Sequence, residues 1–196
     1  DASVTALAVS PSTVYAAGTF ASIGGNSRYL IAALDRTGGA AKDWNANISG
    51  SSPSVNALAV AGTNLYVGGT FSSIGGQTRK CIAMLDASAN ATSFCQNWNA
   101  SPRYIRALAV SDRAVYVGGD YTYSKHVYPF VMELDPATGG FMAWSSSPVG
   151  TRINSLLWSG SALYAGGLFS HVYLQYRDNL VAFDWYTRAD NWQAYR

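Results

Sequence analysis

Residues Ser54 to Asp86 read SVNALAVAGTNLYVGGTFSSIGGQTRKCIAMLD, and they repeat the stretch from Ser3 to Asp35 with 19 identities in 33 positions. Two looser copies begin at Ile105 and Ile153. One tyrosine and one aspartate recur in each copy at intervals of 48 to 51 residues: Tyr15, Tyr66, Tyr116 and Tyr164, and Asp35, Asp86, Asp135 and Asp184. The 196 residues are therefore four repeats of about 49 residues, approximately 3–52, 53–102, 103–150 and 151–196.

Each repeat predicts four short β-strands. Clusters of Gly, Ser, Asn and Asp separate the apolar runs, which in the second repeat are Val55 to Val60, Leu65 to Phe71, Cys81 to Leu85 and Cys95 to Trp98. Gly68 and Gly69 lie inside the second run and predict a β-bulge or a close approach of two backbones. No segment has the length and periodicity of a helix, so we expect an all-β protein.

A four-stranded sheet of this size cannot bury both faces alone, so neighbouring repeats are expected to stack face to face. Twisted sheets stacked in this way curve into a β-propeller of four blades, each a four-stranded antiparallel sheet, in one domain over residues 1–196. The chain starts and stops on repeat boundaries, which favours a complete ring. The alternatives are four consecutive blades of a larger propeller and a solenoid of similar period.

Composition excludes several classes of protein. The chain has 13 Lys and Arg against 11 Asp and Glu, a net charge of +2 without a block of like charges, so no nucleic-acid partner is expected. With 48% hydrophobic residues it is not intrinsically disordered. No apolar run reaches the roughly 18 residues of a membrane span, so we expect no direct membrane insertion. The first residues lack signal-peptide features, but a trimmed secreted chain would look the same.

The second repeat contains the phrases ALAV, YVGGTF, SIGGQTR, IAMLD and WNA, and together they resemble the delta-60-type β-propeller repeat. The resemblance covers the whole chain, closely in the first two repeats and loosely in the last two. That family is similar in architecture to kelch-type and galactose-oxidase-like propellers. The resemblance implies a propeller fold and a secreted or cell-surface location, and it implies no particular reaction.

Packing and turn formation explain the recurring residues. One leucine per repeat alternates with small residues, as expected for inner core strands: Leu7, Leu58, Leu108 and Leu156. One tryptophan near the end of each repeat is expected to fill the wedge between adjacent sheets: Trp44, Trp98, Trp144 and Trp192. The recurring aspartates precede turns whose amides can donate to their carboxylates, with calcium binding or catalysis as the alternative.

Cys81 and Cys95 are the only cysteines, and they flank the turn from Asp86 to Thr92. In an antiparallel hairpin they would stand nearly opposite each other, which predicts a disulfide. The bond would close a loop of about 15 residues and add on the order of 3 kcal/mol. The alternative is two buried free thiols.

Three triplets fit the N-glycosylation pattern and begin at Asn47, Asn90 and Asn99. Such triplets also arise by chance in a chain rich in Asn, Ser and Thr. Together with the cysteine pair, the low Lys and Glu content and the family resemblance, they favour an extracellular or cell-surface location.

Functional residues are expected where the repeat breaks. The loop after the second strand is a compact glycine turn in the first two repeats, SIGGN at 22–26 and SIGGQ at 73–77, but becomes YTYSKHVY at 121–128 and SHVYLQYR at 170–177. Flat rings beside amide and cationic donors suit a sugar-binding or protein-binding surface. The candidate contact residues are Tyr121, Tyr123, Lys125, His126, Tyr128, His171, Tyr173, Gln175, Tyr176 and Arg177. The alternative is that these side chains merely cover blade edges.

An enzymatic function is not expected. A galactose-oxidase-like copper site would need two His, Tyr ligands and a Tyr-linked Cys, and the two cysteines are better used by each other. The chain has no zinc-ligand spacing, nucleophile elbow, P-loop or dinucleotide motif, so we expect no metal and no cofactor.

The sequence therefore predicts a non-enzymatic extracellular or cell-surface module that binds other protein subunits or assembles with itself as a homo-oligomer or filament. Tyrosine enrichment at protein interfaces supports this hypothesis. The alternative is a lectin-like propeller that binds surface glycans, and a galactose-oxidase-like copper enzyme is a remote third.

Overall fold

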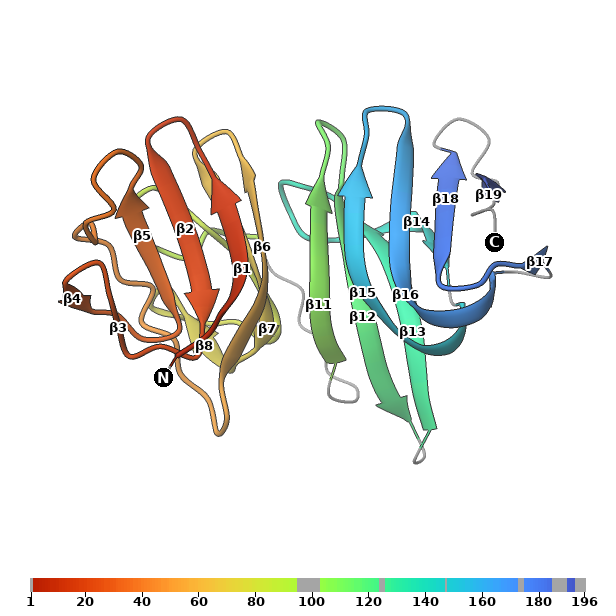
Figure 1. Ribbon diagram of the computed structural model, residues 1–196, viewed down its shortest axis with the longest axis horizontal. Coiled ribbons are helices and arrows are strands. Elements are labelled where there is room, and N and C mark those ends of the chain that lie inside the picture. The colour runs from red at the N-terminus through yellow and green to blue at the C-terminus, as the bar shows by residue number, and fades with distance from the viewer. Residues whose placement is uncertain are drawn as a thin grey trace. The chain divides into compact units, whose positions relative to one another are not determined.

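The computed structural model describes residues 2–94, 103–123, 126–146, 148–172, 175–184 and 190–192. These residues form strands, turns and loops without a helix, so the all-β prediction is confirmed (Figure 1). Two compact units divide the chain, Asp1–Trp98 and Asn99–Arg196, and each holds two repeats. Within the described ranges, no helix suitable for crossing a membrane is found.

Unit 1 contains two three-stranded antiparallel sheets, one from each repeat. Repeat 1 forms the sheet β1-β2-β5 from β1 (Val4–Val9), β2 (Thr13–Gly18) and β5 (Ile31–Asp35). Repeat 2 forms the sheet β6-β7-β10 from β6 (Ser54–Ala61), β7 (Asn64–Thr70) and β10 (Ile82–Leu85). The first three strands predicted for repeat 2 are therefore confirmed.

A two-stranded hairpin follows the second strand of each sheet in unit 1. These hairpins are β3 (Ser22–Ile23) with β4 (Asn26–Ser27), and β8 (Ser73–Ile74) with β9 (Gln77–Thr78). The first turns through Gly24 and Gly25, whose φ angles of 59° and 82° favour glycine. The compact glycine turns predicted here are confirmed.

Unit 2 contains one sheet from each of the last two repeats. Repeat 3 forms β11 (Arg103–Val110), β12 (Val115–Tyr123), β13 (His126–Leu134) and β14 (Phe141–Ser146), in that order across the sheet. Repeat 4 forms β15 (Val149–Trp158), β16 (Ala162–Val172), β18 (Leu180–Asp184) and β19 (Asp190–Trp192), again in that order. A short β17 (Gln175–Tyr176) pairs with the far end of β16.

Each sheet presents two different faces, because side chains alternate along a strand. We define the leucine face as the one that carries Leu7, Leu58, Leu108 or Leu156. The tyrosine face carries Tyr15, Tyr66, Tyr116 or Tyr164, and the strand registers place it on the opposite side.

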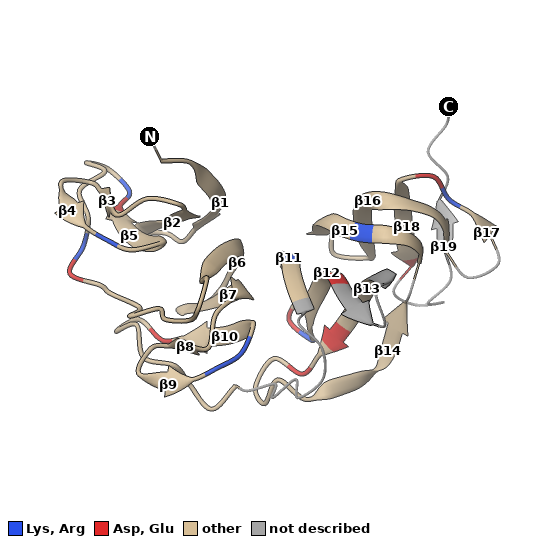
Figure 2. Cartoon of the chain, turned by 90° about the horizontal axis from the view of Figure 1, so that it is seen from below, with Lys and Arg blue, Asp and Glu red and all other residues tan. Residues whose placement is uncertain are grey.

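In both units, the tyrosine face of one repeat packs against the leucine face of the next. Tyr15 of repeat 1 is buried in one cluster with Leu58 and Val67 of repeat 2. Tyr116 of repeat 3 is buried in another with Ala165 of repeat 4, and Leu156 packs against this cluster. Figure 2 shows the two sheets of each unit lying one over the other, and the strands β1, β2, β6 and β7 carry no charged residue. The predicted face-to-face stacking is thus present inside each unit.

Tryptophans fill the space between the stacked sheets. Trp44 is buried and makes an edge contact with Tyr15, with ring centroids 5.5 Å apart. Trp144 is also buried and contacts Phe183 at 5.0 Å. The wedge-filling role is confirmed for these two tryptophans, while Trp98 and the Trp192 side chain lie outside the described residues.

The core prediction is wrong for Leu7 in unit 1. Leu58 and Leu108 are buried and Leu156 is partly buried, but Leu7 is 62% exposed. Phe20 and Ile23 cover the leucine face of repeat 1 over its second and third strands, which leaves β1 uncovered.

The fourth strand differs between the two units. The prediction of a four-stranded sheet is confirmed for repeats 3 and 4, which form this strand as β14 and β19, and it is wrong for repeat 1, which has three strands and a single bridge between Leu34 and Ala41. The chain then makes a tight turn, in which the amide of Trp44 donates to the carbonyl of Lys42 at 2.8 Å. In repeat 2 a bridge joins Leu85 and Ala91, and the predicted strand at Cys95 to Trp98 lies outside the described residues.

The glycines predicted inside the second strand lie opposite a β-bulge. In repeat 2 the register shifts between Val55 and Ala57, which pair with Gly69 and Gly68. A Cβ atom on Gly69 would lie 2.0 Å from the carbonyl oxygen of Ser54. The corresponding glycine of every repeat has the same close approach, at 1.9 to 2.2 Å: Gly18, Gly69, Gly119 and Gly167. Both the bulge and the close backbone approach are confirmed.

We therefore predict that Gly69→Ala destabilises the protein by about 2 kcal/mol or more, because the methyl group would force β6 and β7 apart. Urea unfolding followed by tryptophan fluorescence measures the change.

The control is Gly38→Ala, because a Cβ atom there would meet its nearest neighbour at 3.7 Å. Equal stability losses in the two variants would contradict the role assigned to Gly69.

Candidate functional site

The tyrosine-rich segments are extensions of strands rather than the loops predicted from the sequence. In repeat 3, β12 and β13 continue past the sheet as one ladder, which pairs Tyr121 with Tyr128 and Tyr123 with His126. Tyr, Thr and Val favour strands, and they make up most of residues 121–123 and 126–128. The structure describes the backbone of these four residues, and Lys125 lies outside the described residues.

In repeat 4 the corresponding hairpin brings two candidate residues into contact. His171 of β16 pairs with Tyr176 of β17, and their ring centroids lie 5.2 Å apart with the ring planes perpendicular. The hydroxyl of Ser170 lies 2.9 Å from Nδ1 of His171. Tyr176 is 48% exposed, and its hydroxyl donates to Oδ2 of Asp178 at 3.3 Å. Tyr173 lies outside the described residues.

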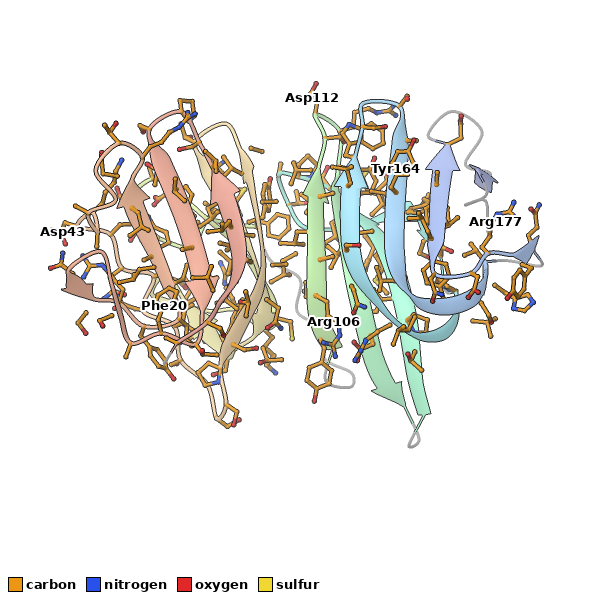
Figure 3. All side chains as sticks on the ribbon, viewed as in Figure 1. Phe20, Asp43, Arg106, Asp112, Tyr164 and Arg177 are labelled. Atoms are coloured by element: carbon orange, nitrogen blue, oxygen red, sulfur yellow. The ribbon has the colours of Figure 1, made fainter. Side chains whose placement is uncertain are left out.

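Arg177 holds this hairpin in place. It is buried, its Nη1 donates to the carbonyl of Tyr176 at 2.9 Å, and its Nη2 donates to Oε1 of Gln175 (Figure 3). Its backbone amide donates to the carbonyl of Ser170 at 2.9 Å. Gln175 is exposed beside it. We therefore assign Arg177 to positioning the hairpin rather than to contacting a partner.

The same anchor occurs in unit 1, where the sequence analysis did not identify it. Arg28 donates to the carbonyls of Ser27 at 2.8 Å and Lys42 at 2.6 Å. Arg79 likewise donates to the carbonyls of Thr78 and Thr92. The signal was the arginine that ends SIGGNSR, SIGGQTR and VYLQYR, because a guanidinium can join a hairpin to the next segment of its own repeat.

Repeat 3 contains an ion pair that was not predicted from the sequence. Arg106 donates through Nε to Oδ1 of buried Asp120, and its guanidinium lies 5.9 Å from the centre of the Tyr104 ring. In repeat 2 Thr70 takes the place of Asp120, and its hydroxyl lies 2.8 Å from the hydroxyl of Ser54. The available signal was Arg106 itself, because the other repeats have Thr or Asn at its position.

Buried Glu133 breaks the repeat on the tyrosine face of repeat 3. It is 1% exposed on β13 and pairs with Tyr116. The corresponding residues are Ala33, Met84 and Ala182. Because Glu133 is buried within a core strand, a ligand in solution does not reach it, and we do not include it in the candidate site.

The recurring aspartates accept hydrogen bonds from their own turns, as predicted. Oδ1 of Asp35 accepts from the amides of Gly38 and Thr37 at 2.8 and 3.0 Å. These bonds lower the pKa of Asp35, and the backbone amides of Asn90 and Ser88 lower the pKa of Asp86. The turn after Asp184 lies outside the described residues.

The cysteine and glycosylation predictions are only partly within the described residues. Cys81 is half-buried with a φ of 69°, whereas Cys95 lies outside, so the disulfide stays a prediction. Asn47 and Asn90 are exposed, as a glycan acceptor must be, and Asn99 lies outside the described residues. In the part of the chain that the structure describes, no three His, Cys, Asp or Glu side chains are grouped to hold a metal ion.

Comparison with known proteins does not assign the chain to a family. No protein-family model matches it, and no curated protein matches its sequence. The resemblance to delta-60-type repeats therefore rests on the sequence phrases alone.

We predict that Asp135→Asn makes the protein less stable at neutral pH and that the deficit narrows in acid. The amide and hydroxyl of Thr138 donate to Asp135 and lower the pKa of its carboxyl. A carboxylate with a lowered pKa contributes stability above the unfolded-state value of about 3.9, and this contribution is lost as the pH falls through the folded-state value. Urea unfolding of the native protein and the variant at neutral and at acidic pH measures the loss of stability and its dependence on pH.

Thr138→Val serves as the comparison, because it keeps the amide donor to Asp135 and removes the hydroxyl, which also accepts from the amide of Gly140 at 3.1 Å. We expect a loss that narrows less in acid, because the bond from Gly140 does not involve the carboxylate. A deficit in Asp135→Asn that stays constant across the pH range would argue against the carboxylate as its source.

Proposed function

We propose that the four repeats close into a four-bladed β-propeller that acts as a non-enzymatic extracellular or cell-surface assembly module. The closure is supported by the faces that each unit leaves uncovered. Leu7 and Val9 on the leucine face of repeat 1 are 62% and 55% exposed, and Leu157 on the tyrosine face of repeat 4 is 64% exposed. Contact between these faces would repeat the pairing found within each unit.

The proposed contact surface comprises His171 and Tyr176 of the hairpin together with the neighbouring Val149. This hairpin pairs two residues with two, as the hairpins of repeats 1 and 2 do. What differs is its side chains: Arg177 fixes the hairpin, and the His171 and Tyr176 rings are in contact where repeat 1 pairs two serines. Val149, which pairs with His171, is 60% exposed. Exposed aromatic and apolar side chains on a rigid hairpin support a protein partner.

A second copy of the chain is the partner that we propose. A net charge of +2 on 196 residues produces little repulsion between copies. The recurring residues are accounted for by packing, turns and hairpin anchors, which supports a binding role rather than catalysis. A lectin that uses the same hairpin remains the alternative function.

We predict that Tyr176→Ala weakens self-association by about tenfold or more, because exposed tyrosines in interfaces often contribute that much binding energy. Sedimentation velocity over a concentration series measures the association of the native protein and the variant. A glycan array on the same samples tests the lectin alternative.

Tyr29→Ala is the matched control, because Tyr29 of repeat 1 is 53% exposed, similar to Tyr176, and should leave association unchanged. A native protein that stays monomeric, or a Tyr176→Ala variant that associates like the native one, would refute the assembly module. If the native protein is monomeric and binds a glycan, and Tyr176→Ala abolishes that binding, the lectin alternative is favoured.

A further inference from the structure

A cleft of about 590 Å³ lies between the sheets of repeats 1 and 2, inside unit 1. It is at the end of the sheets that carries the β1–β2 and β6–β7 turns (Figure 1), and residues of both turns line it, among them Ser12 and Thr63. The volume falls within the range of small-molecule binding sites.

Lys42 supplies a fixed cation to this cleft. Its Nζ donates to the carbonyl of Ser12 and to Oγ1 of buried Thr13, both at 2.8 Å. An ammonium group has three donors, so two bonds to the protein hold the group in place and leave one hydrogen for a ligand. The next residue, Asp43, also lines the cleft and is exposed at the edge of unit 1 (Figure 3).

Tyr15 supplies a neutral hydroxyl at the same place. Trp44 is only 6% exposed and its Nε1 is buried, so this residue contributes ring surface to the wall rather than a donor. Tyr15 also lines the cleft, and burial raises the pKa of its phenol, which keeps the hydroxyl protonated at neutral pH. Ala33 and Val60 provide apolar wall between these groups.

The charged pair is specific to repeat 1. In repeat 2 Thr92 and Ser93 take the place of Lys42 and Asp43, because the Thr92 amide donates to Met84 as that of Lys42 donates to Ala33. The ring that follows, Phe94, contacts Tyr66 as Trp44 contacts Tyr15. In repeats 3 and 4 the two residues before the tryptophan are Met142 and Ala143, and Asp190 and Asn191. Only the first repeat has a cation beside a carboxylate, so packing of the aromatic ring does not require the pair.

We propose that this cleft binds a neutral sugar unit of a glycan. Adjacent sugar hydroxyls both donate and accept, so one can accept from Lys42 while its neighbour donates to Asp43. The hydroxyl of Tyr15 offers a further polar group, and the C–H groups of the sugar ring suit the apolar wall. An anion is disfavoured, because Asp43 balances the charge of Lys42.

This site is independent of the proposed assembly surface. The cleft is in unit 1 at the turn end of its sheets, whereas the hairpin of His171 and Tyr176 belongs to unit 2. Either proposal can therefore fail while the other holds.

The test is a glycan array on the whole chain, followed by saturation-transfer NMR with free glucose, galactose, mannose, fucose and N-acetylglucosamine at millimolar concentration. We expect at least one sugar to bind. Lys42→Met and Asp43→Asn should each weaken binding by about tenfold or more, since each removes a charged hydrogen-bonding group. Thermal unfolding checks that each variant is folded. If Lys42→Met does not fold, Asp43→Asn still tests the proposal, because Asp43 is exposed and its substitution should not disturb the core.

Lys80→Met is the matched control, because Lys80 is exposed on repeat 2 and lines no part of the cleft, and Tyr176→Ala should also bind normally. The proposal is overturned if none of the five sugars binds, or if folded Asp43→Asn binds like the native protein. It is equally overturned if Tyr176→Ala abolishes binding, because the sugar site would then be on the hairpin.

Discussion

The contact between a tyrosine face and a leucine face is the constraint on which this protein depends. A three- or four-stranded sheet that is apolar on both sides gains little stability alone, because burial of one face leaves the other in water. Repeats 1 and 2 solve this by placing Tyr15 opposite Leu58 and its neighbours. Repeats 3 and 4 use the same pairing with Tyr116 and Leu156. The proposed ring extends the same pairing to the leucine face of repeat 1 and the tyrosine face of repeat 4, which still expose apolar side chains.

Two further devices keep the sheets alike while the connecting segments vary. A bulge opposite a glycine lets the first two strands of every repeat approach closely, as at Gly69. An arginine such as Arg28 joins the hairpin after the second strand to the segment that follows the third. Because the bulge does not involve the hairpin, and the arginine does not fix the other hairpin side chains, repeat 4 could place aromatic rings on its hairpin and repeat 1 could place Lys42 and Asp43 at a cleft without loss of the core. Repeat 3 has Tyr128 in place of the arginine.

Local patterns in the sequence predicted the first three strands of each repeat, the bulge and the aspartate turns, because each depends on residues near one another in the chain. The repeat also predicted the partners of the sheets, because identical units have identical faces to cover. It did not predict the hairpin extension at Tyr121 to Tyr128, since polar tyrosine-rich strands and loops have similar composition. Nor could it predict the cleft, which requires Lys42 and Thr63 from different repeats to lie at one end of the stack.

Small-angle X-ray scattering of the whole chain, extrapolated to zero concentration, tests the central claim most directly. If every tyrosine face covers a leucine face, including those of repeats 4 and 1, the chain is compact, with a radius of gyration of about 16 Å for its length and a single maximum in the distance distribution. A clearly larger radius with two maxima would show that the first and last repeats do not meet, and would contradict the closed ring.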